Sequence, residues 1–139
     1  MTLKVLASGK IRVNLPLGAN AQLHGTMYTV PTGLTAFIKE LLLNHESANA
    51  VVMNIEPYIL KSGDTDLTTV ATNTAVETRA VAENKNVILF GAQLAQATLG
   101  ILARNTLLAA GDSVRIWSYY AAVTPGNTDV FFQLSGDEF

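Results

Sequence analysis

The sequence predicts an all-β fold, an antiparallel β-sandwich of the jelly-roll type, and three observations support this prediction. Turn-forming pairs such as Ser-Gly, Gly-Asp and Pro-Gly recur along the whole chain. Runs of strand length lie between these turns, and many are rich in Val, Ile, Thr, Tyr and Phe. Several runs alternate apolar and polar residues, the pattern of a strand that is buried on one side. The pattern leaves room for a short helix and for an extended N-terminal arm.

The length of 139 residues fits one domain and is too short for two of ordinary size. We divide the chain into an N-terminal strand or arm at residues 1–20 and a single β-sandwich domain at residues 21–139. Residues 10–15 alternate apolar and polar side chains between two turn signals. This run predicts either a first strand or an arm that reaches a neighbouring subunit.

Three later runs are the clearest predicted strands: residues 51–60, 113–120 and 129–135. Each alternates, so each is expected to bury one face and to leave the other in solvent. In the last run, one predicted face carries Val130, Phe132 and Leu134, and the other carries Phe131 and Gln133.

Three segments allow two interpretations. Residues 35–45 have the i, i+4 apolar spacing of an amphipathic helix, but strands are predicted on both sides, so we favour a strand. Residues 71–83 and 93–104 are rich in Ala. They predict either short helical turns or a long excursion over one end of the sandwich.

Charge and cysteine content exclude several classes of function. Charged residues make up 14% of the chain, the net charge is −2, and the nine Lys and Arg residues are scattered. No basic stripe is available to follow a phosphate backbone, so we expect no nucleic-acid partner. Cysteine is absent, which excludes disulfides, cysteine-based zinc sites and thiol catalysis. A surface of low charge suits a subunit within an assembly.

The hydropathy pattern predicts a protein without a membrane partner. The N-terminal residues have no long apolar run of the signal-peptide kind. The most apolar stretch, residues 87–102, is interrupted by Gly and Gln, so it does not predict a membrane span. We expect the chain to be made in a cytoplasm.

Isolated catalytic candidates are better explained as ordinary structural residues. His24 and His45 lack the spacing of metal ligands and lie in or near predicted strands. The Gly-Asp-Ser-Val block at residues 111–114 is similar to an esterase block. It comes late in the chain and no histidine follows it, so it predicts a turn that leads into a strand.

The remaining polar and aromatic candidates are also weak. Asp64 and Asp66 could offer oxygens to calcium, but a solvated hairpin loop is the simpler interpretation. Trp117 with the pair at residues 119–120 could stack on a sugar, although packing in a core or between subunits is favoured. Residues 137–139 predict a solvated tail. We therefore predict no enzyme, and no catalytic, cofactor-binding or metal-binding residue.

One stretch is more specific. The run YTVPTGLTAFIK at residues 28–39 leads to an Asn-containing turn and to a second apolar run near residues 50–55. Pro31 should end one strand, Gly33 should turn the chain, and the next strand should pair back on the first. An apolar run, Gly-Asp, an alternating strand and a closing Ser-Gly-Asp-Glu follow at residues 107–116 and 135–138.

These segments resemble small β-sandwich virion proteins of tailed bacteriophages, over residues 26–60 and 105–138. The resemblance implies a structural protein of the phage particle. The first expectation is a capsid decoration (cement) protein, a homotrimer whose partner is the major capsid protein and whose place is the exterior of the virion. The alternative is a tail, baseplate or fibre component that binds a glycan or receptor on the host.

Overall fold

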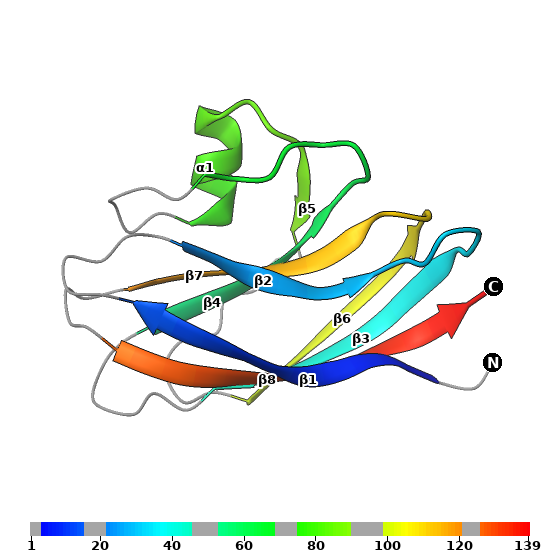
Figure 1. The fold of residues 1–139 in the computed structure, drawn as a ribbon, viewed down its shortest axis with the longest axis horizontal. Helices are drawn as coiled ribbons and strands as arrows, with labels where there is room; N and C mark the ends of the chain where they lie inside the picture. The colour runs from blue at the N-terminus through cyan, green and yellow to red at the C-terminus, as the bar shows by residue number, and fades with distance from the viewer. Residues whose placement is uncertain (1–3, 16–21, 46–52, 69–74, 90–98, 121–125) are drawn as a thin grey trace.

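The computed structural model describes residues 4–15, 22–45, 53–68, 75–89, 99–120 and 126–139 (Figure 1). These residues form eight strands and one helix. The elements are β1 Lys4–Leu15, β2 Gln22–Thr29, β3 Ala36–His45, β4 Met53–Leu60, α1 Val76–Ala82, β5 Val87–Leu89, β6 Leu99–Leu108, β7 Ser113–Tyr120 and β8 Gly126–Glu138.

The strands form two antiparallel four-stranded sheets that pack face to face, as predicted (Figure 1). Sheet 1 has the order β1-β8-β3-β6, and sheet 2 has the order β2-β7-β4-β5. This order is that of a jelly roll, in which the first strand lies beside the last. Consecutive strands alternate between the two sheets except at β4 and β5, which are neighbours in sheet 2. The predicted fold class is therefore confirmed.

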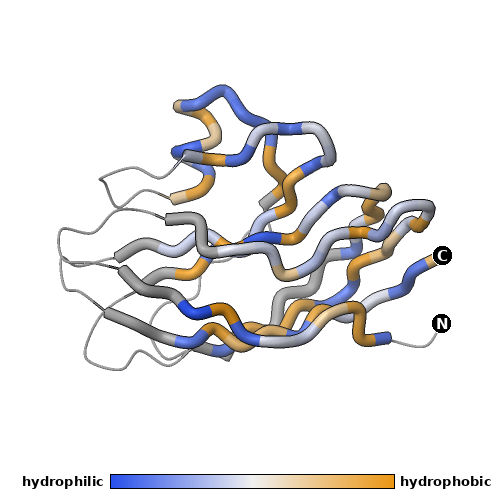
Figure 2. Tube along the Cα trace, viewed as in Figure 1, coloured by the Kyte–Doolittle hydropathy of each residue, from blue (hydrophilic) through white to orange (hydrophobic). Residues whose placement is uncertain are grey.

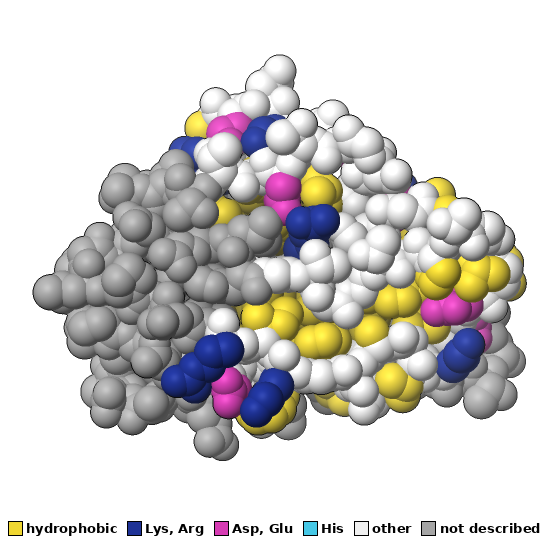
Figure 3. All heavy atoms as spheres, in the orientation of Figure 1, with side chains coloured by type: hydrophobic (Ala, Val, Ile, Leu, Met, Phe, Trp, Pro, Cys, Tyr) yellow, Lys and Arg dark blue, Asp and Glu magenta, His cyan; other side chains and the backbone are white. Residues whose placement is uncertain are grey.

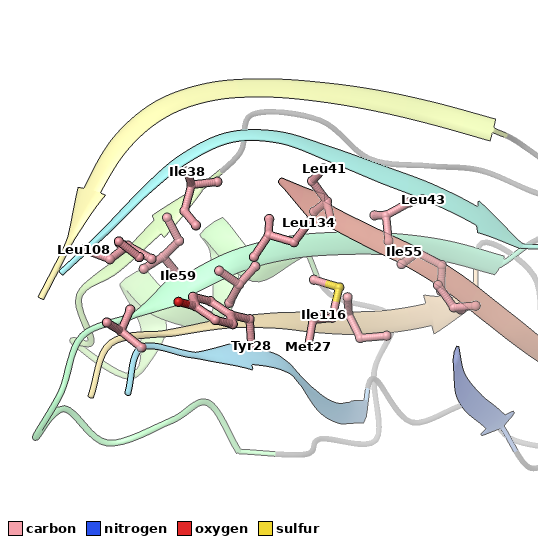
Figure 4. Close-up of a cluster of buried hydrophobic side chains, with 14 residues drawn as sticks. Met27, Tyr28, Ile38, Leu41, Leu43, Ile55, Ile59, Leu108, Ile116 and Leu134 are labelled. Atoms are coloured by element: carbon pink, nitrogen blue, oxygen red, sulfur yellow. The ribbon is translucent and has the colours of Figure 1, made fainter. Parts of the chain in front are cut away.

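The core lies between the sheets and takes one face of each strand (Figure 4). Figure 2 shows apolar positions recurring along the strands, while hydrophilic residues gather around α1 and the turn that follows it. Alternation works as predicted in β8, where Val130 and Leu134 are buried and Phe131 is exposed. The main buried side chains are Met27, Tyr28, Ile38, Leu41, Leu43, Ile55, Ile59, Leu108, Val114, Ile116, Val130 and Leu134.

A second, smaller core lies on the outer face of sheet 2, beneath α1. Trp117 and Tyr58 are fully buried there against Val76 and Ala80 of the helix. The Glu56 carboxylate accepts a hydrogen bond of 2.7 Å from the backbone N–H of Val76, which fixes the start of α1 on the sheet. The prediction that β4 and β7 bury one face only was thus wrong, because α1 covers the other face.

Most ambiguous segments are resolved. Residues 36–45 form a strand rather than a helix, and residues 76–82 form the short helix. Residues 99–104 belong to β6, while residues 71–74 and 93–98 lie outside the described residues. Within the predicted N-terminal strand or arm, residues 4–15 form β1 and pair with β8 of the same chain.

Residues 31–34 form a turn, but its consequence differs from the prediction. The backbone N–H of Leu34 bonds the carbonyl of Pro31 at 3.1 Å, and Gly33 has a φ of +81°. The next strand, β3, does not pair back on β2, because the two strands belong to opposite sheets. The turn carries the chain across the sandwich.

The C-terminal residues are not the solvated tail that the sequence predicted. Asp137 lies 3.5 Å from the Lys39 ammonium, and Glu138 accepts a 2.8 Å hydrogen bond from the Tyr28 hydroxyl. Burial, and then the hydrogen bond and charge of Glu138, raise the pKa of Tyr28 well above its usual range. The backbone N–H and carbonyl of Phe139 both bond Thr35, so the chain is paired to its end.

Candidate interaction surface

The predicted Gly-Asp-Ser-Val turn joins two loops through one carboxylate. Asp112 is 1% exposed, and it accepts hydrogen bonds from the backbone N–H of Ser62 at 2.8 Å and of Ala109 at 2.9 Å. The Lys61 ammonium lies 2.5 Å from the same carboxylate. Gly111 has a φ of +87°, the left-handed conformation that favours glycine. We call these five residues the turn junction.

The electrostatics of the turn junction fit a structural role. Burial alone would raise the pKa of Asp112, but the hydrogen bonds from Lys61, Ser62 and Ala109 outweigh it and hold the pKa below its usual range. The neighbouring Ser113 is buried, and its hydroxyl accepts a 2.9 Å hydrogen bond from Arg115 Nε. The block therefore stabilises two turns, in agreement with its sequence-based interpretation.

Asp66 is held by protein groups rather than left free for a cation. Its carboxylate accepts hydrogen bonds from the Tyr58 hydroxyl at 2.7 Å and from the Leu67 N–H at 2.8 Å. Arg115 pairs with it at 2.7 Å. Asp64 is exposed in the preceding turn. Within the described ranges, no group of three acidic or histidine side chains lies close enough to share a metal ion.

A second polar network ties α1 to the chain around it. Glu83 accepts hydrogen bonds from Thr68 and Lys85 and pairs with Arg79 at 2.9 Å. Burial would raise the pKa of Glu83, but these partners lower it below its usual range. An open polar hollow of about 310 Å³ lies beside the network, and it is lined by residues 64–65 and 83–86. The ion pairs of this region are used to hold α1 in place.

The aromatic candidates divide between the core and the part of the chain that is not described. Trp117 is fully buried beneath α1, so its ring cannot stack on a sugar in this conformation. Residues 119 and 120 lie in β7, but their side chains are outside the described residues. The same is true of His24 in β2 and His45 at the end of β3.

The outer face of sheet 1 differs from that of sheet 2, since no described element covers it. The register places Leu42 and Gln133 side by side on this face, and Asn44 beside Phe131. Phe131 is 49% exposed there, and Leu107 of β6 is 58% exposed. A hollow of about 170 Å³ opens beside Phe131, lined by residues 42–44 and 131–133. Exposed apolar side chains around a hollow are typical of protein contact surfaces.

The sequence carried one signal for this surface. Residues 131 and 132 are both Phe, so on a strand one of the two rings must point out of the core. The hollow itself was missed, because it depends on the register of β3 against β8, two strands that are far apart in the sequence.

The outer edge of β1 is the second surface of interest. β1 pairs with β8 along one side, and it is the terminal strand of sheet 1. Its register is regular from Ala7 to Leu15. Figure 3 shows apolar side chains gathered between β1 and β2. Leu6, Ala7 and Ile11 of β1 are only partly buried against the core. A long, regular edge of this kind can accept a strand from another chain.

Comparisons with family models, with curated proteins and with solved structures give no significant match to this chain. In the described residues, no helix is both long and apolar enough to span a membrane. The function proposed below therefore rests on the geometry of the chain and on the sequence resemblance.

Proposed function

We propose that the chain is a structural subunit of a tailed-phage particle, a decoration protein that binds the outer surface of the major capsid protein lattice. The observation that carries this proposal is the division of the surface. α1 covers the outer face of sheet 2 at β4 and β7, whereas sheet 1 presents exposed apolar side chains and, among the described strands, an edge at β1. Surfaces of this kind join subunits, and the jelly roll is a fold that viral capsid proteins use.

The proposed mechanism is mechanical rather than chemical. A subunit that binds only the assembled lattice stabilises that lattice by mass action. We assign the capsid contact to the outer edge of β1, where an extended capsid segment would continue sheet 1 by backbone hydrogen bonds. In this proposal residues 4–15 do not reach out as an arm; they remain paired with β8 and offer their outer edge to the capsid segment. An oligomer with several such edges would bind the lattice more tightly than one chain alone.

The competing function, recognition of a host glycan by a tail component, loses its best candidate. The ring of Trp117 was the centre of the predicted stacking platform, and it packs on Tyr58 and Val76 instead. A platform on the described surface would need Trp117 to leave this core. Attachment to other protein subunits is therefore the function that the described surface favours.

The test uses particles that lack this protein and purified protein added back to them. Because the chain has no cysteine, a single one can carry a photo-crosslinker. Lys4→Cys places it at the exposed start of β1, and Val81→Cys places it on α1, where the side chain is 79% exposed. We expect saturable binding, greater heat resistance of the particles, and a crosslink to the major capsid protein from position 4 but not from position 81.

Two results would count against the proposal. Failure of the added protein to sediment with the particles would reject capsid binding. Saturable binding with a crosslink from position 81 alone would keep capsid binding but reject the edge of β1 as its site.

A further inference from the structure

We propose that the chain between β4 and β5, which carries α1, is a lid that opens from sheet 2 as one unit while the two sheets stay packed. We call it the α1 lid, and its described residues are 61–68 and 75–86. Figure 1 shows α1 outside the sandwich, on the side of sheet 2. This inference concerns the isolated protein and does not depend on capsid binding.

The two ends of the α1 lid lie side by side. β4 ends at Leu60, and β5 begins at Val87, which pairs with Leu60 in the register of the two strands. The lid is thus an excursion that leaves sheet 2 and returns to it at the same place. Because its ends already meet, the lid can move without any change in the pairing of β4 with β7.

Polar contacts join the described parts of the lid to one another. Glu83, directly after α1, accepts a 2.8 Å hydrogen bond from the Thr68 hydroxyl and pairs with Arg79 at 2.9 Å. Arg79 in turn donates a 3.2 Å hydrogen bond to the Thr68 hydroxyl. The Lys85 ammonium donates to the backbone carbonyl of Asp66. Since these bonds link the chain before α1 to the helix and to the chain after it, we expect the lid to move as one body.

Two carboxylates attach the described lid to the strands beneath it. Asp66 of the lid accepts a hydrogen bond from the Tyr58 hydroxyl of β4 and pairs with Arg115 of β7, each at 2.7 Å. Glu56 of β4 accepts the 2.7 Å hydrogen bond from the N–H of Val76 at the start of α1. The polar attachment is therefore concentrated at two places.

The apolar contact under the lid is separate from the main core. The described lid buries three apolar side chains against sheet 2: Leu67, Val76 and Ala80. They pack on Tyr58, Leu60 and Trp117. None of these six residues belongs to the cluster of fourteen buried residues between the sheets. Opening the lid therefore leaves that cluster in place.

α1 depends on sheet 2 for its structure. It has 7 residues, fewer than the roughly 12–15 that an isolated helix needs to be stable in water. Its own N-cap residue, Ala75, has no polar side chain, and Glu56, which bonds the first turn, belongs to β4. Because the lid adds few buried contacts and cannot hold its own shape, its opening should cost less free energy than unfolding of the sandwich.

The open lid uncovers a face that the closed lid hides. The register sets Glu56 beside Trp117, and Tyr58 beside Arg115, on β4 and β7. Both aromatic rings are fully buried when the lid is closed. The position of the lid therefore decides whether these rings can be reached from solvent.

Urea titration followed by two probes tests the inference. Trp117 is the single tryptophan of the chain, so its fluorescence and its quenching by iodide report the lid, whereas far-UV circular dichroism reports the strands. We expect the fluorescence midpoint to lie at a lower urea concentration than the dichroism midpoint. Coincident midpoints would overturn the inference, because they indicate one cooperative transition.

Three valine-to-alanine variants separate the lid from the sandwich. Val76→Ala removes a buried contact of α1, so it should lower the fluorescence midpoint by about 1 M urea and leave the dichroism midpoint unchanged. Val81→Ala changes an exposed position of the same helix and should move neither midpoint. Val130→Ala, in the core between the sheets, should lower the dichroism midpoint. If Val76→Ala moved both midpoints equally, the lid would not be a separate unit.

Hydrogen exchange of the wild-type protein repeats the test without any substitution. The N–H groups of Val76 and Lys85 are bonded within or beneath the lid, while β3 and β8 are the central strands of sheet 1. Under conditions that favour the folded protein, we expect the two lid amides to be at least about tenfold less protected than the amides of β3 and β8. Equal protection of the two groups would refute a lid that opens before the sandwich.

Discussion

Replacement of Asp112 by Ala tests how strongly one buried carboxylate stabilises the sandwich. The substitution removes the acceptor for the backbone N–H groups of Ser62 and Ala109 and the partner of the Lys61 ammonium. Two separate loops, residues 61–64 and 109–112, lose the group that joins them.

The magnitude follows from the number and surroundings of these bonds. A hydrogen bond to an ionised group contributes about 1.5–3 kcal/mol. Ser62 and Ala109 are exposed, so their freed amides can bind water and the lower value applies to each. Lys61 is 41% exposed, and its ion pair adds little because solvent screens it. We expect a loss of about 3 kcal/mol, which lowers the melting temperature by about 10 °C in a chain of this size.

Urea unfolding and thermal melting measure this loss. Asp64→Asn, an exposed position in the loop at residues 61–64, is the control and should change the free energy of unfolding by less than about 0.5 kcal/mol. Folding lowers the pKa of Asp112, so the stabilisation of the fold by its ionised carboxylate is fully present at neutral pH. This stabilisation is lost as the pH falls below about 4 and the carboxylate is protonated. The difference in the free energy of unfolding between Asp112→Asn and the wild type should therefore shrink as the pH falls through that range. An Asp112→Ala protein as stable as the Asp64→Asn control would refute this reasoning.

Three further predictions concern packing and titration. Gly136→Ala should destabilise the fold by more than about 2 kcal/mol, roughly the cost of overpacking, because the added Cβ would lie 1.9 Å from a backbone oxygen of β3. Gly9→Ala is the control: its added Cβ would make only ordinary contacts, so the same melting assay should show it to be tolerated. The single Trp117 should emit at short wavelength and resist iodide quenching, and emission typical of exposed indole would contradict its burial. Burial, and then the hydrogen bond to Asp66, raise the pKa of Tyr58, as burial does for Tyr28. Since folding holds both phenols neutral, alkaline titration at 295 nm should show these two ionising only as the protein unfolds at high pH. Independent titration of both phenols near pH 10 would contradict their burial.

Local pattern was enough to predict the fold class and the strands near residues 51–60, 113–120 and 129–135, whereas it left residues 35–45 and 93–104 open between helix and strand. Alternation in β8 identified which side chains face the core, since a strand buried on one side imposes a period of two. The turn at Gly111 and Asp112 was also predicted correctly, because left-handed backbone and a nearby acceptor are local requirements. These properties depend on residues that are neighbours in the sequence.

Features that depend on distant pairing could not be predicted. The outer face of β4 is buried because α1 returns to cover it, and nothing in residues 53–60 indicates that contact. The turn at residues 31–34 has the same local chemistry whether the chain pairs back or crosses to the other sheet. The hollow beside Phe131 requires the register of β3 on β8. The surface on which the functional proposals rest is therefore a product of topology rather than of any motif.

The number of copies per particle tests the proposed function most directly. Quantitative mass spectrometry of purified virions can measure this chain against the major capsid protein. A subunit that decorates the lattice should be present in numbers of the same order as the capsid protein itself. Absence from the particle, or a copy number that fits only a tail or baseplate ring, would contradict the account.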